Sequence, residues 1–347
     1  MKIKKSKEIM EAFEKTYSNF LKYLQGDKFA HIHKYGNYDL ALPDVIEEMK
    51  LAYKVNCGVE PRLERTPNDL FEKIKFNGDI SFKLLTQVET NKNLKKRVIK
   101  KNILIPMDYT KIVDKNFNTY IPYGYYTDNI ILPVVVSGNN EWITPNEMEY
   151  NTMKPSIDKA FGDVVVFGLG IGFYAYEIGL KDNVKSITII EFDEEIIENF
   201  NKLIYPLFPQ NIKDKIKIIH GNAFDYLNRD FMDNFDYGFI DIWLNNSDGL
   251  EIYKEILKKD FDINKVDFWI ENQFFIDVQL YLFTYFTHYF RGSLTEACLG
   301  NEDIPVWLKH INRTIKSLDR EDIVTTESFL NLLQDKELIR LLLKTKK

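Results

Sequence analysis

The stretch Val164-Val165-Val166-Phe167-Gly168-Leu169-Gly170-Ile171-Gly172 decides the fold of this 347-residue chain. Four apolar residues, three of them β-branched, run directly into three glycines at alternate positions, and the pattern of a helix follows over 173–180. This order predicts a buried strand, a tight turn and a helix N-terminus, where backbone N–H groups can approach a nucleotide. Glycine admits a ligand to the backbone where a Cβ would collide.

Around this turn, residues 163–273 alternate strand and helix patterns with short links, which is typical of a parallel sheet wrapped by helices. Further strands are expected over 186–190, 216–219, 237–240 and 267–270. Helices are expected over 193–204, with Asp193 as the cap, over 224–229 and over 249–258. Parallel sheets bind ligands at the carboxyl ends of their strands. We therefore expect one crevice to be faced by the residues at those ends, which are Gly168, Glu191, Asn222 and Asp241.

The glycine spacing distinguishes between two kinds of nucleotide site. A dinucleotide fold needs G-x-G-x-x-G, because its third glycine allows close packing of the helix on the strand. Here the motif is G-x-G-x-G, and Phe173 occupies the position of that third glycine. A benzyl group at this position obstructs the usual approach of helix and strand, so the spacing disfavours a dinucleotide.

Taken together, the glycine turn, Glu191, the Gly-Asn-Ala at 221–223 and the Phe-Asp-Tyr-Gly-Phe-Ile-Asp at 235–241 carry a family resemblance. The set resembles the class I S-adenosylmethionine-dependent methyltransferases, and especially their spermidine synthase-like branch. The resemblance covers about 163–273. It implies an α/β fold with a Rossmann-like parallel sheet flanked by helices, and S-adenosylmethionine as the cofactor.

The resemblance also implies roles for single residues. The three glycines of the turn would contact the amino-acid part of the cofactor through their backbone, and Glu191 would accept hydrogen bonds from both ribose hydroxyls. Asn222 stands where the family usually has an aspartate facing the adenine amino group, and Ala223 would let its backbone approach the ring. The residues alone leave an alternative, in which Glu191 only caps the following helix and Asn222 only makes a turn.

Asp241 is the candidate catalytic residue. Methyl transfer requires the partners to be oriented and, where needed, a proton to be removed from the nucleophile. In aminopropyltransferases, which the chain resembles, an aspartate at this strand end helps to deprotonate or position the attacking amine. Trp243, Asn245 and Asp248 would then line the substrate side. The alternative is that Asp241 only holds backbone amides or caps a loop.

The segment 139–147 precedes the glycine turn by one predicted helix, over 148–161. Its aromatic and acidic residues, Trp142 and Glu147 among them, could fold over the mouth of the site. In the alternative, the segment is a connection in which Thr144 or Asn146 caps the helix.

The family motifs that would name an acceptor are absent. Spermidine synthases carry D-x-x-D after this strand, whereas here Asp248 follows Asp241 by seven residues. The asparagine–proline–proline–aromatic motif of nucleic-acid amino methyltransferases is missing, and no final antiparallel hairpin is evident after Gln273. We therefore predict a methyltransferase acting on a small molecule or peptide. An aminopropyltransferase acting on a polyamine and a non-catalytic S-adenosylmethionine-binding or assembly module are the alternatives.

The flanking regions are predicted as an N-terminal α+β domain over 1–150, as a cofactor-binding domain over 151–275 and as a helical extension over 276–347. In the first, helices are expected from Ile9 to about Gly26, over 43–55 and around 70–74, and strands over 81–88, 102–106, 120–126 and 130–136. The basic run 92–101 favours a solvated connection over a nucleic-acid contact. In the extension, the aromatic segment 274–290 indicates a packing surface or a substrate wall, and helices are expected over 304–316 and 328–343.

Composition sets the remaining bounds. With 46 basic and 52 acidic residues, the net charge of −6 disfavours a chain devoted to phosphate backbones or anionic membranes. The two cysteines lack metal-ligand spacing, and nothing recognisable completes a metal site with His31 and His33. No apolar window is long enough to span a membrane, and the N-terminus has no signal-peptide core, so a cytoplasmic protein is expected. A homo-oligomer stays open.

Overall fold

The computed structural model describes residues 1–24, 71–74, 145–244 and 246–345, together with short pieces of the chain between 89 and 143. The pieces are 89, 91, 94–100, 105–106, 111–112, 114–117, 119–120, 123–126, 129–137 and 140–143. The helix expected over 43–55, the strand expected over 81–88, and His31 and His33 lie outside the described residues.

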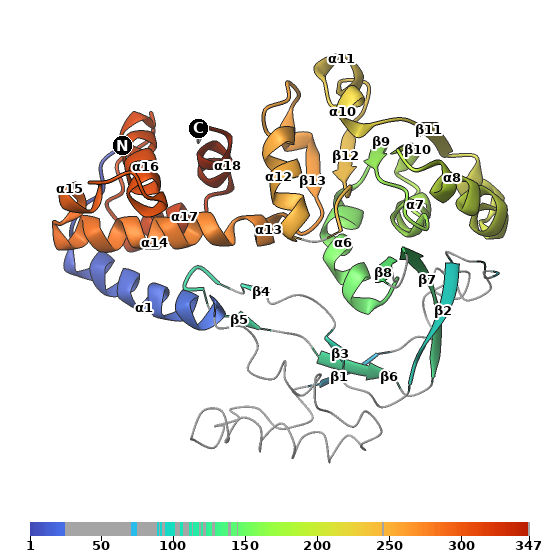
Figure 1. Cartoon of the computed structure of the whole chain (residues 1–347), viewed down its shortest axis with the longest axis horizontal. Helices are drawn as coiled ribbons and strands as arrows, with labels where there is room; N and C mark the ends of the chain where they lie inside the picture. Colours follow the sequence, from blue (N-terminus) through green and yellow to red (C-terminus); the bar gives the residue numbers. More distant parts are fainter. Residues whose placement is uncertain are drawn as a thin grey trace.

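A parallel sheet of five strands forms the centre of the molecule (Figure 1). Its strands are β9 (Gly162–Phe167), β10 (Val184–Glu191), β11 (Ile216–His220), β12 (Tyr237–Ile240) and β13 (Val266–Phe268). They lie in the order β11-β10-β9-β12-β13, and every pairing is parallel. This order is that of a doubly wound Rossmann-like sheet, in which the chain reverses direction beside the first strand. It confirms the predicted α/β class.

The sheet is covered on both faces, because the side chains of β9 alternate between two cores. Val164 and Val166 join a core that includes α6 (Glu147–Lys159) and α7 (Phe173–Gly179). Val165 and Phe167 join a second core that includes residues of α12 (Asn246–Ile256) and α14 (Ile276–Arg291). The four side chains are almost fully buried, which explains why this strand is a continuous apolar run.

The connections between the strands follow the prediction with one exception. The single helix expected over 224–229 is wrong, because one helix reaches its C-terminal cap at Leu227 and Asn228 caps the next. The helix expected over 193–204 is α8 (Glu194–Asn199), continued by the π-helical turn η2 (Phe200–Ile204), and Asp193 caps it. The remaining short elements of this half are η3 (Tyr205–Leu207), α9 (Gln210–Lys213), α10 (Ala223–Tyr226), α11 (Arg229–Met232), η4 (Ile263–Lys265) and α13 (Glu271–Phe274).

Helices follow β13, and no further strand is present among the described residues after it. They are α14, α15 (Leu294–Ala297), α16 (Asp303–Ser317), α17 (Thr326–Leu333) and α18 (Lys336–Thr345). The single helix expected over 328–343 is wrong, because the chain divides it at Gln334 and Asp335. Asp335 starts α18 by accepting the N–H of Leu338 at 3.0 Å, which is the role of an N-terminal cap.

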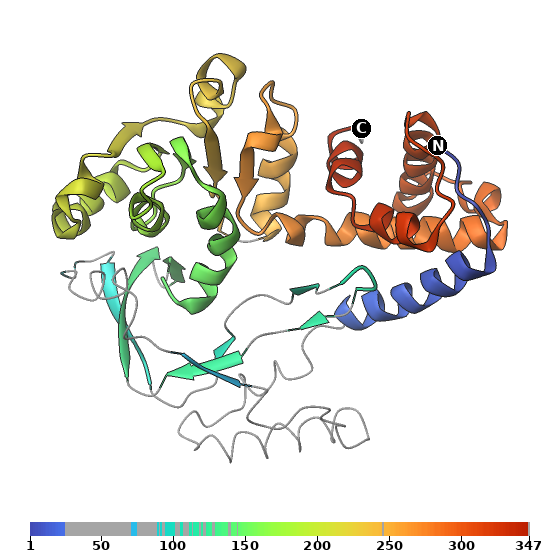
Figure 2. The ribbon, with the colours of Figure 1, turned by 180° about the vertical axis from the view of Figure 1, so that it is seen from behind.

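The aromatic segment of α14 is a packing surface. The ring of Phe283 lies 4.6 Å from that of Phe20, and the ring of Phe286 lies 5.0 Å from that of Phe329. Phe20 belongs to α1 (Lys7–Leu24), the amphipathic helix expected at the start of the chain. In both views α1 lies along α14, so the start of the chain packs against its C-terminal helices (Figures 1 and 2). The divisions at 150 and 275 stay predictions.

Small sheets, drawn beneath the central one in Figure 1, correct two expectations. They comprise β1 (Phe71–Ile74), β6 (Tyr123–Tyr126) and β3 (Ile105–Pro106); β2 (Leu94–Ile99), β7 (Ile130–Ser137) and β8 (Asn140–Ile143); and β4 (Lys111–Ile112) with β5 (Thr119–Tyr120). The helix expected around 70–74 is wrong, because that segment pairs in parallel with β6. The basic run is also wrong as a connection, because it forms strand β2 against β7. A strand needs long-range partners, which local sequence patterns do not reveal.

Within the described ranges, no helix combines the length and the apolar composition needed to cross a membrane.

Candidate active site

A cavity of about 460 Å³ opens at the carboxyl ends of the parallel strands. Its volume falls in the range of roughly 300–1,000 Å³ that is usual for small-molecule and cofactor sites. Seven of the residues predicted from the sequence line it, namely Gly168, Gly170, Glu191, Asn222, Ala223, Asp241 and Trp243. The strand-end rule therefore places these residues around one space, although four strands supply them.

Gly168 sets the distance between the first strand and Asp241. Its φ is +98°, and a Cβ on it would lie 2.0 Å from the carbonyl oxygen of Asp241. Only glycine permits both the backbone conformation and the close approach. The Asp241 N–H donates to the carbonyl of Phe167 at 2.9 Å, so the ends of β9 and β12 are joined beside the turn.

Gly172 has a different role from the other glycines of the turn. It caps α7 with a φ of +75°, and a Cβ on it would lie 2.2 Å from Cε2 of the fully buried Phe200. It is not among the residues lining the cavity. The third glycine therefore allows η2 to pack against the start of α7.

Glu191 is buried, and both of its carboxylate oxygens accept backbone N–H groups. Oε2 accepts from Leu169 in the glycine turn at 2.8 Å, and Oε1 accepts from Asp193 at 2.8 Å. Glu191 thus ties the glycine turn to the start of α8, as the capping alternative anticipates. Each oxygen keeps further acceptor capacity, so a bound ribose can still donate to it.

Asn222 also uses its side chain within the protein. Its Oδ1 accepts the N–H of Phe224 at 3.0 Å and thereby caps α10. Ala223, the first residue of that helix, is buried and lines the cavity. A small side chain at this point leaves the backbone open to a flat ring.

Asp241 contrasts with both of these residues. Its side chain is half-buried, and no hydrogen bond to its carboxylate is present among the described residues. Burial raises the pKa of Asp241 well above its usual range, and the negative charges of Glu149 and Glu191 raise it further. This carboxylate is therefore available to a ligand and holds a proton more readily than an exposed aspartate does.

The sequence missed two residues of the far wall. Glu149, not Glu147, lines the cavity from α6, and Trp269 closes it from the end of β13. The indole N–H of Trp269 donates to Thr152 Oγ1 of α6 at 3.0 Å. The strand-end rule that selected Asp241 could have found Trp269, because Trp269 follows β13. The sequence does not show whether Glu147 or Glu149 faces the cavity, because that depends on which face of α6 is turned inward.

Other predicted residues are not brought to the cavity. Asp248 is exposed at the start of α12, where its carboxylate accepts the N–H of Leu244 at 2.9 Å. Glu147 begins α6 outside the lining. Trp142 lies on β8, but its side chain is outside the described residues, as is all of Asn245. Asn146 caps α6 by accepting the N–H of Glu149 at 3.0 Å, as the alternative for this segment anticipates.

All the charged side chains among the described residues that line the cavity are acidic. Four carboxylates line it, those of Glu149, Glu191, Asp193 and Asp241, and the described lining residues include no lysine, arginine or histidine. Such a wall favours a cation over an anion. In the part of the chain that the structure describes, no group of three or more His, Cys, Asp or Glu side chains could hold a metal ion.

S-adenosylmethionine fits these residues chemically. Its sulfonium and ammonium groups match the acidic wall, and its nucleoside matches the apolar surface of Ile196, Ala223 and Phe224. Among the described lining residues no basic side chain faces its carboxylate, which leaves neutral donors such as the backbone N–H groups of the glycine turn and the indole N–H of Trp243. The fit is therefore good for the nucleoside and the cations, and weaker for the carboxylate.

No protein-family model matches the chain, and no curated protein matches its sequence. Solved structures similar to part of it include the methyltransferase domain of a bacterial CtHen1, at 14% identity and a TM-score of 0.23, over 31% of this chain and 55% of that one. Spermidine synthase from Thermotoga maritima is similar at 16% and 0.29, over 42% and 54%. The glycopeptide N-methyltransferase MtfA in complex with S-adenosylmethionine is similar at 16% and 0.24, over 36% and 55%.

The chain thus spans little more than half the length of each of these solved chains. Likenesses this weak say only what the chain is similar to. The assignment to the α/β class with a Rossmann-like sheet stands on the strand order and on the cavity at the carboxyl ends of the strands.

Proposed function

We propose that the chain is an S-adenosylmethionine-dependent methyltransferase acting on a small-molecule or peptide acceptor. The observation that carries the proposal is the Asp241 carboxylate, which has no described partner and faces a cavity built by a glycine turn at the strand ends. A desolvated carboxylate that faces the cavity can serve as the general base that an acceptor needs. When bound, the cofactor supplies the electrophilic methyl carbon.

The chain's own residues would orient the partners. The backbone of Gly168 and Gly170 and the remaining acceptor capacity of Glu191 would hold the nucleoside and amino-acid parts of the cofactor. Trp243 and Trp269 would hold the acceptor on the opposite side. Orientation of this kind supplies most of the rate enhancement in a displacement in which the donor carries its own leaving group.

The acidic wall supports an amine as the acceptor. An ammonium group would be attracted by the carboxylates of Asp241 and Glu149, and it must lose a proton before its nitrogen can attack. Asp241 would take that proton, because its raised pKa brings it closer to the pKa of the group it deprotonates. We therefore assign Asp241 as the general base and Glu149 as the group that tunes it.

A second candidate function is aminopropyl transfer to a polyamine. It is favoured by one specific observation, the lack of any basic side chain among the described lining residues. A decarboxylated cofactor carries no carboxylate that would need such a side chain. The third possibility, a binding or assembly module without catalysis, is favoured by no feature of the cavity.

Parallel incubations distinguish these functions. S-adenosylmethionine and its decarboxylated form are each supplied with a panel of amines, and products are identified by mass spectrometry. The proposal predicts a gain of one methyl group with S-adenosylmethionine and with no other donor. An aminopropyl adduct formed only from the decarboxylated form would establish the second function. Binding of S-adenosylhomocysteine without any turnover, in wild type and D241N alike, would favour the third.

A further inference from the structure

Three consecutive residues after β13 connect the cavity to the C-terminal helices. The first is Trp269, which lines the cavity. Its backbone N–H donates to the carbonyl of Ile240 at the end of β12, at 3.0 Å, and its indole N–H donates to Thr152 of α6. Trp269 therefore joins the sheet to the helix that carries Glu149.

The second residue, Ile270, holds a strained backbone conformation. Its φ is 49° and its ψ is 26°, in the left-handed region that β-branched residues rarely adopt. In the described part of the chain only Phe117 and Ile270 among non-glycine residues have a positive φ. Strain of this kind persists only where the surrounding structure imposes it, so something must hold Ile270 from outside.

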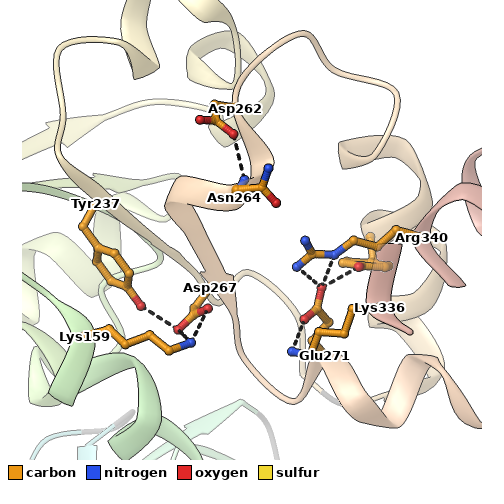
Figure 3. Close-up of polar contacts among 9 residues, drawn as sticks. Lys159, Tyr237, Asp262, Asn264, Asp267, Glu271, Lys336 and Arg340 are labelled. Carbon is orange, nitrogen blue, oxygen red and sulfur yellow. Dashed lines mark hydrogen bonds and ion pairs between the residues drawn. The ribbon is translucent and has the colours of Figure 1, made fainter. Parts of the chain in front are cut away.

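The third residue, Glu271, is that external restraint. Only 6% of its side chain is exposed, and it accepts hydrogen bonds from Tyr253 Oη of α12 at 2.6 Å, from Lys336 Nζ at 2.9 Å and from Arg340 Nε at 2.8 Å. Lys336 and Arg340 both belong to α18 and reach Glu271 from one side (Figure 3). A buried carboxylate with this many donors cannot move without breaking several charged bonds at once.

The helix that supplies these donors is itself firmly placed. Leu338, Ile339 and Leu342 of α18 are fully buried. The Arg340 guanidinium also lies over the ring of Phe268, 5.7 Å from its centroid, at the end of β13. The restraint on Glu271 is thus anchored in the core that also holds Val165 and Phe167 of β9, yet no described residue after 275 lines the cavity.

We infer that Arg340 and Lys336 are positioning residues for the cavity: by holding Glu271, they keep Ile270 left-handed and Trp269 against α6. The C-terminal extension thereby sets the affinity of the cavity for its ligand without touching the ligand. The inference rests on the proposed function only in the choice of S-adenosylhomocysteine as the probe.

A double-mutant cycle tests this coupling. S-adenosylhomocysteine is titrated calorimetrically into wild type, R340M, I270G and the double variant. We expect R340M to weaken binding about tenfold in the wild-type background and about twofold in the I270G background. The reason is that glycine adopts the left-handed conformation without strain and needs no restraint. R229M removes the exposed ion pair between Arg229 of α11 and Asp260, and it serves as the matched control, with no expected change.

Hydrogen–deuterium exchange provides a readout that needs no ligand. R340M should speed exchange in the peptide that contains the Trp269 amide. Adding I270G to R340M should restore slow exchange there. K336M, which removes a half-exposed partner, should give the same pattern more weakly and replaces R340M if that variant does not fold. Equal weakening by R340M in both backgrounds, or exchange changes confined to α18, would overturn the inference. A wild type that does not bind the probe would instead defeat the proposed function, and exchange would still decide the inference.

Discussion

At the carboxyl edge of the sheet, the polar side chains that follow β10 and β11 and the one that follows β12 are bonded in opposite ways. On the β10–β11 half, both oxygens of Glu191 and the side-chain oxygen of Asn222 already accept backbone N–H groups. On the β9–β12 half, the Asp241 carboxylate accepts none from the described residues, and its pKa is raised by burial and by neighbouring negative charge. The same kind of residue at the same kind of position is therefore built into the fold on one side and left for a ligand on the other.

This difference separates binding from chemistry. Side chains whose oxygens are held by the backbone are preorganised, so a ligand meets them without a cost of reorganisation. A desolvated carboxylate without a bonded partner makes the charged form of the folded protein less stable, and pKa values perturbed in this way cluster at functional sites. We therefore expect substitutions on the two halves to have separable effects.

The largest effect should come from G168A, because Gly168 joins the two halves. Its Cβ would strain the backbone and collide with the carbonyl of Asp241. We expect a loss of about 4 kcal/mol in the free energy of unfolding, from strain and overpacking together. G292A is the matched control, because Gly292 also has a positive φ (+76°) but nothing lies within 4 Å of its Cβ. G292A should lower the free energy of unfolding by about 1 kcal/mol, and urea denaturation measures both variants. Equal losses in G168A and G292A would contradict the account.

D241N removes the proposed general base on the β9–β12 half and leaves the β10–β11 half intact. We expect turnover to fall about a thousandfold, the usual contribution of a general base, while S-adenosylhomocysteine still binds through the glycine turn, Glu191 and the remaining carboxylates of the wall. Steady-state kinetics and calorimetry on the same preparation measure both. Turnover at the wild-type rate would remove Asp241 from the mechanism.

E191Q removes one of the two acceptor oxygens that Glu191 uses on the β10–β11 half. An amide offers one acceptor oxygen in place of two, so the N–H of Leu169 or of Asp193 would lose its partner and face an NH₂ group. We expect a loss of about 2 kcal/mol in the free energy of unfolding, the usual cost of an unsatisfied buried polar group. Thermal unfolding measures it, with E147Q as the control on an acidic residue outside the cavity. Unchanged stability would mean that Glu191 does not hold the glycine turn.

E149Q should have the smallest effect and sharpen the comparison through pH. Removing the Glu149 charge removes one cause of the raised pKa of Asp241, so that pKa falls. A general base acts deprotonated, and the acidic limb of the kcat/KM profile should therefore move to lower pH. An unmoved limb would assign the titration to another group.

The same raised pKa gives a prediction for stability. The folded state holds the Asp241 proton more tightly than the unfolded chain does, so the stability from this group is present at low pH and is lost as the pH rises through the folded pKa. D241N lacks this loss. The melting temperature of D241N relative to wild type should therefore increase with pH over that window, and a constant difference would contradict the cause assigned to the shift.

Local sequence signals were sufficient for the sheet and for the near side of the cavity. The apolar run before Gly168 and the polar residues at the strand ends depend on neighbours in sequence, and the parallel order follows from alternating strands and helices. The helix expected around 70–74 is wrong because the segment pairs with β6, and a contact between residues so far apart in sequence leaves no local signal. The break at Asp335 was missed because a cap inside an apolar periodic run resembles an exposed residue of one helix.

The far wall could not be predicted in the same way. Whether Glu147 or Glu149 faces the cavity depends on how α6 is rotated against the sheet, which its packing partners decide. The assignment of Gly172 to packing depends on Phe200, which lies 28 positions later in the sequence and meets it only in the fold. Arg340 bonds to Glu271 across 69 positions of the sequence, and no local pattern indicates that contact.

The most direct test of the account compares S-adenosylhomocysteine binding to wild type, D241N and E191Q by calorimetric titration, with NAD as the competing dinucleotide. The account predicts one site per chain, an affinity that survives D241N and falls in E191Q, and no competition by NAD. The absence of heat with wild type, competition by NAD, or loss of binding in D241N with full binding in E191Q would contradict it.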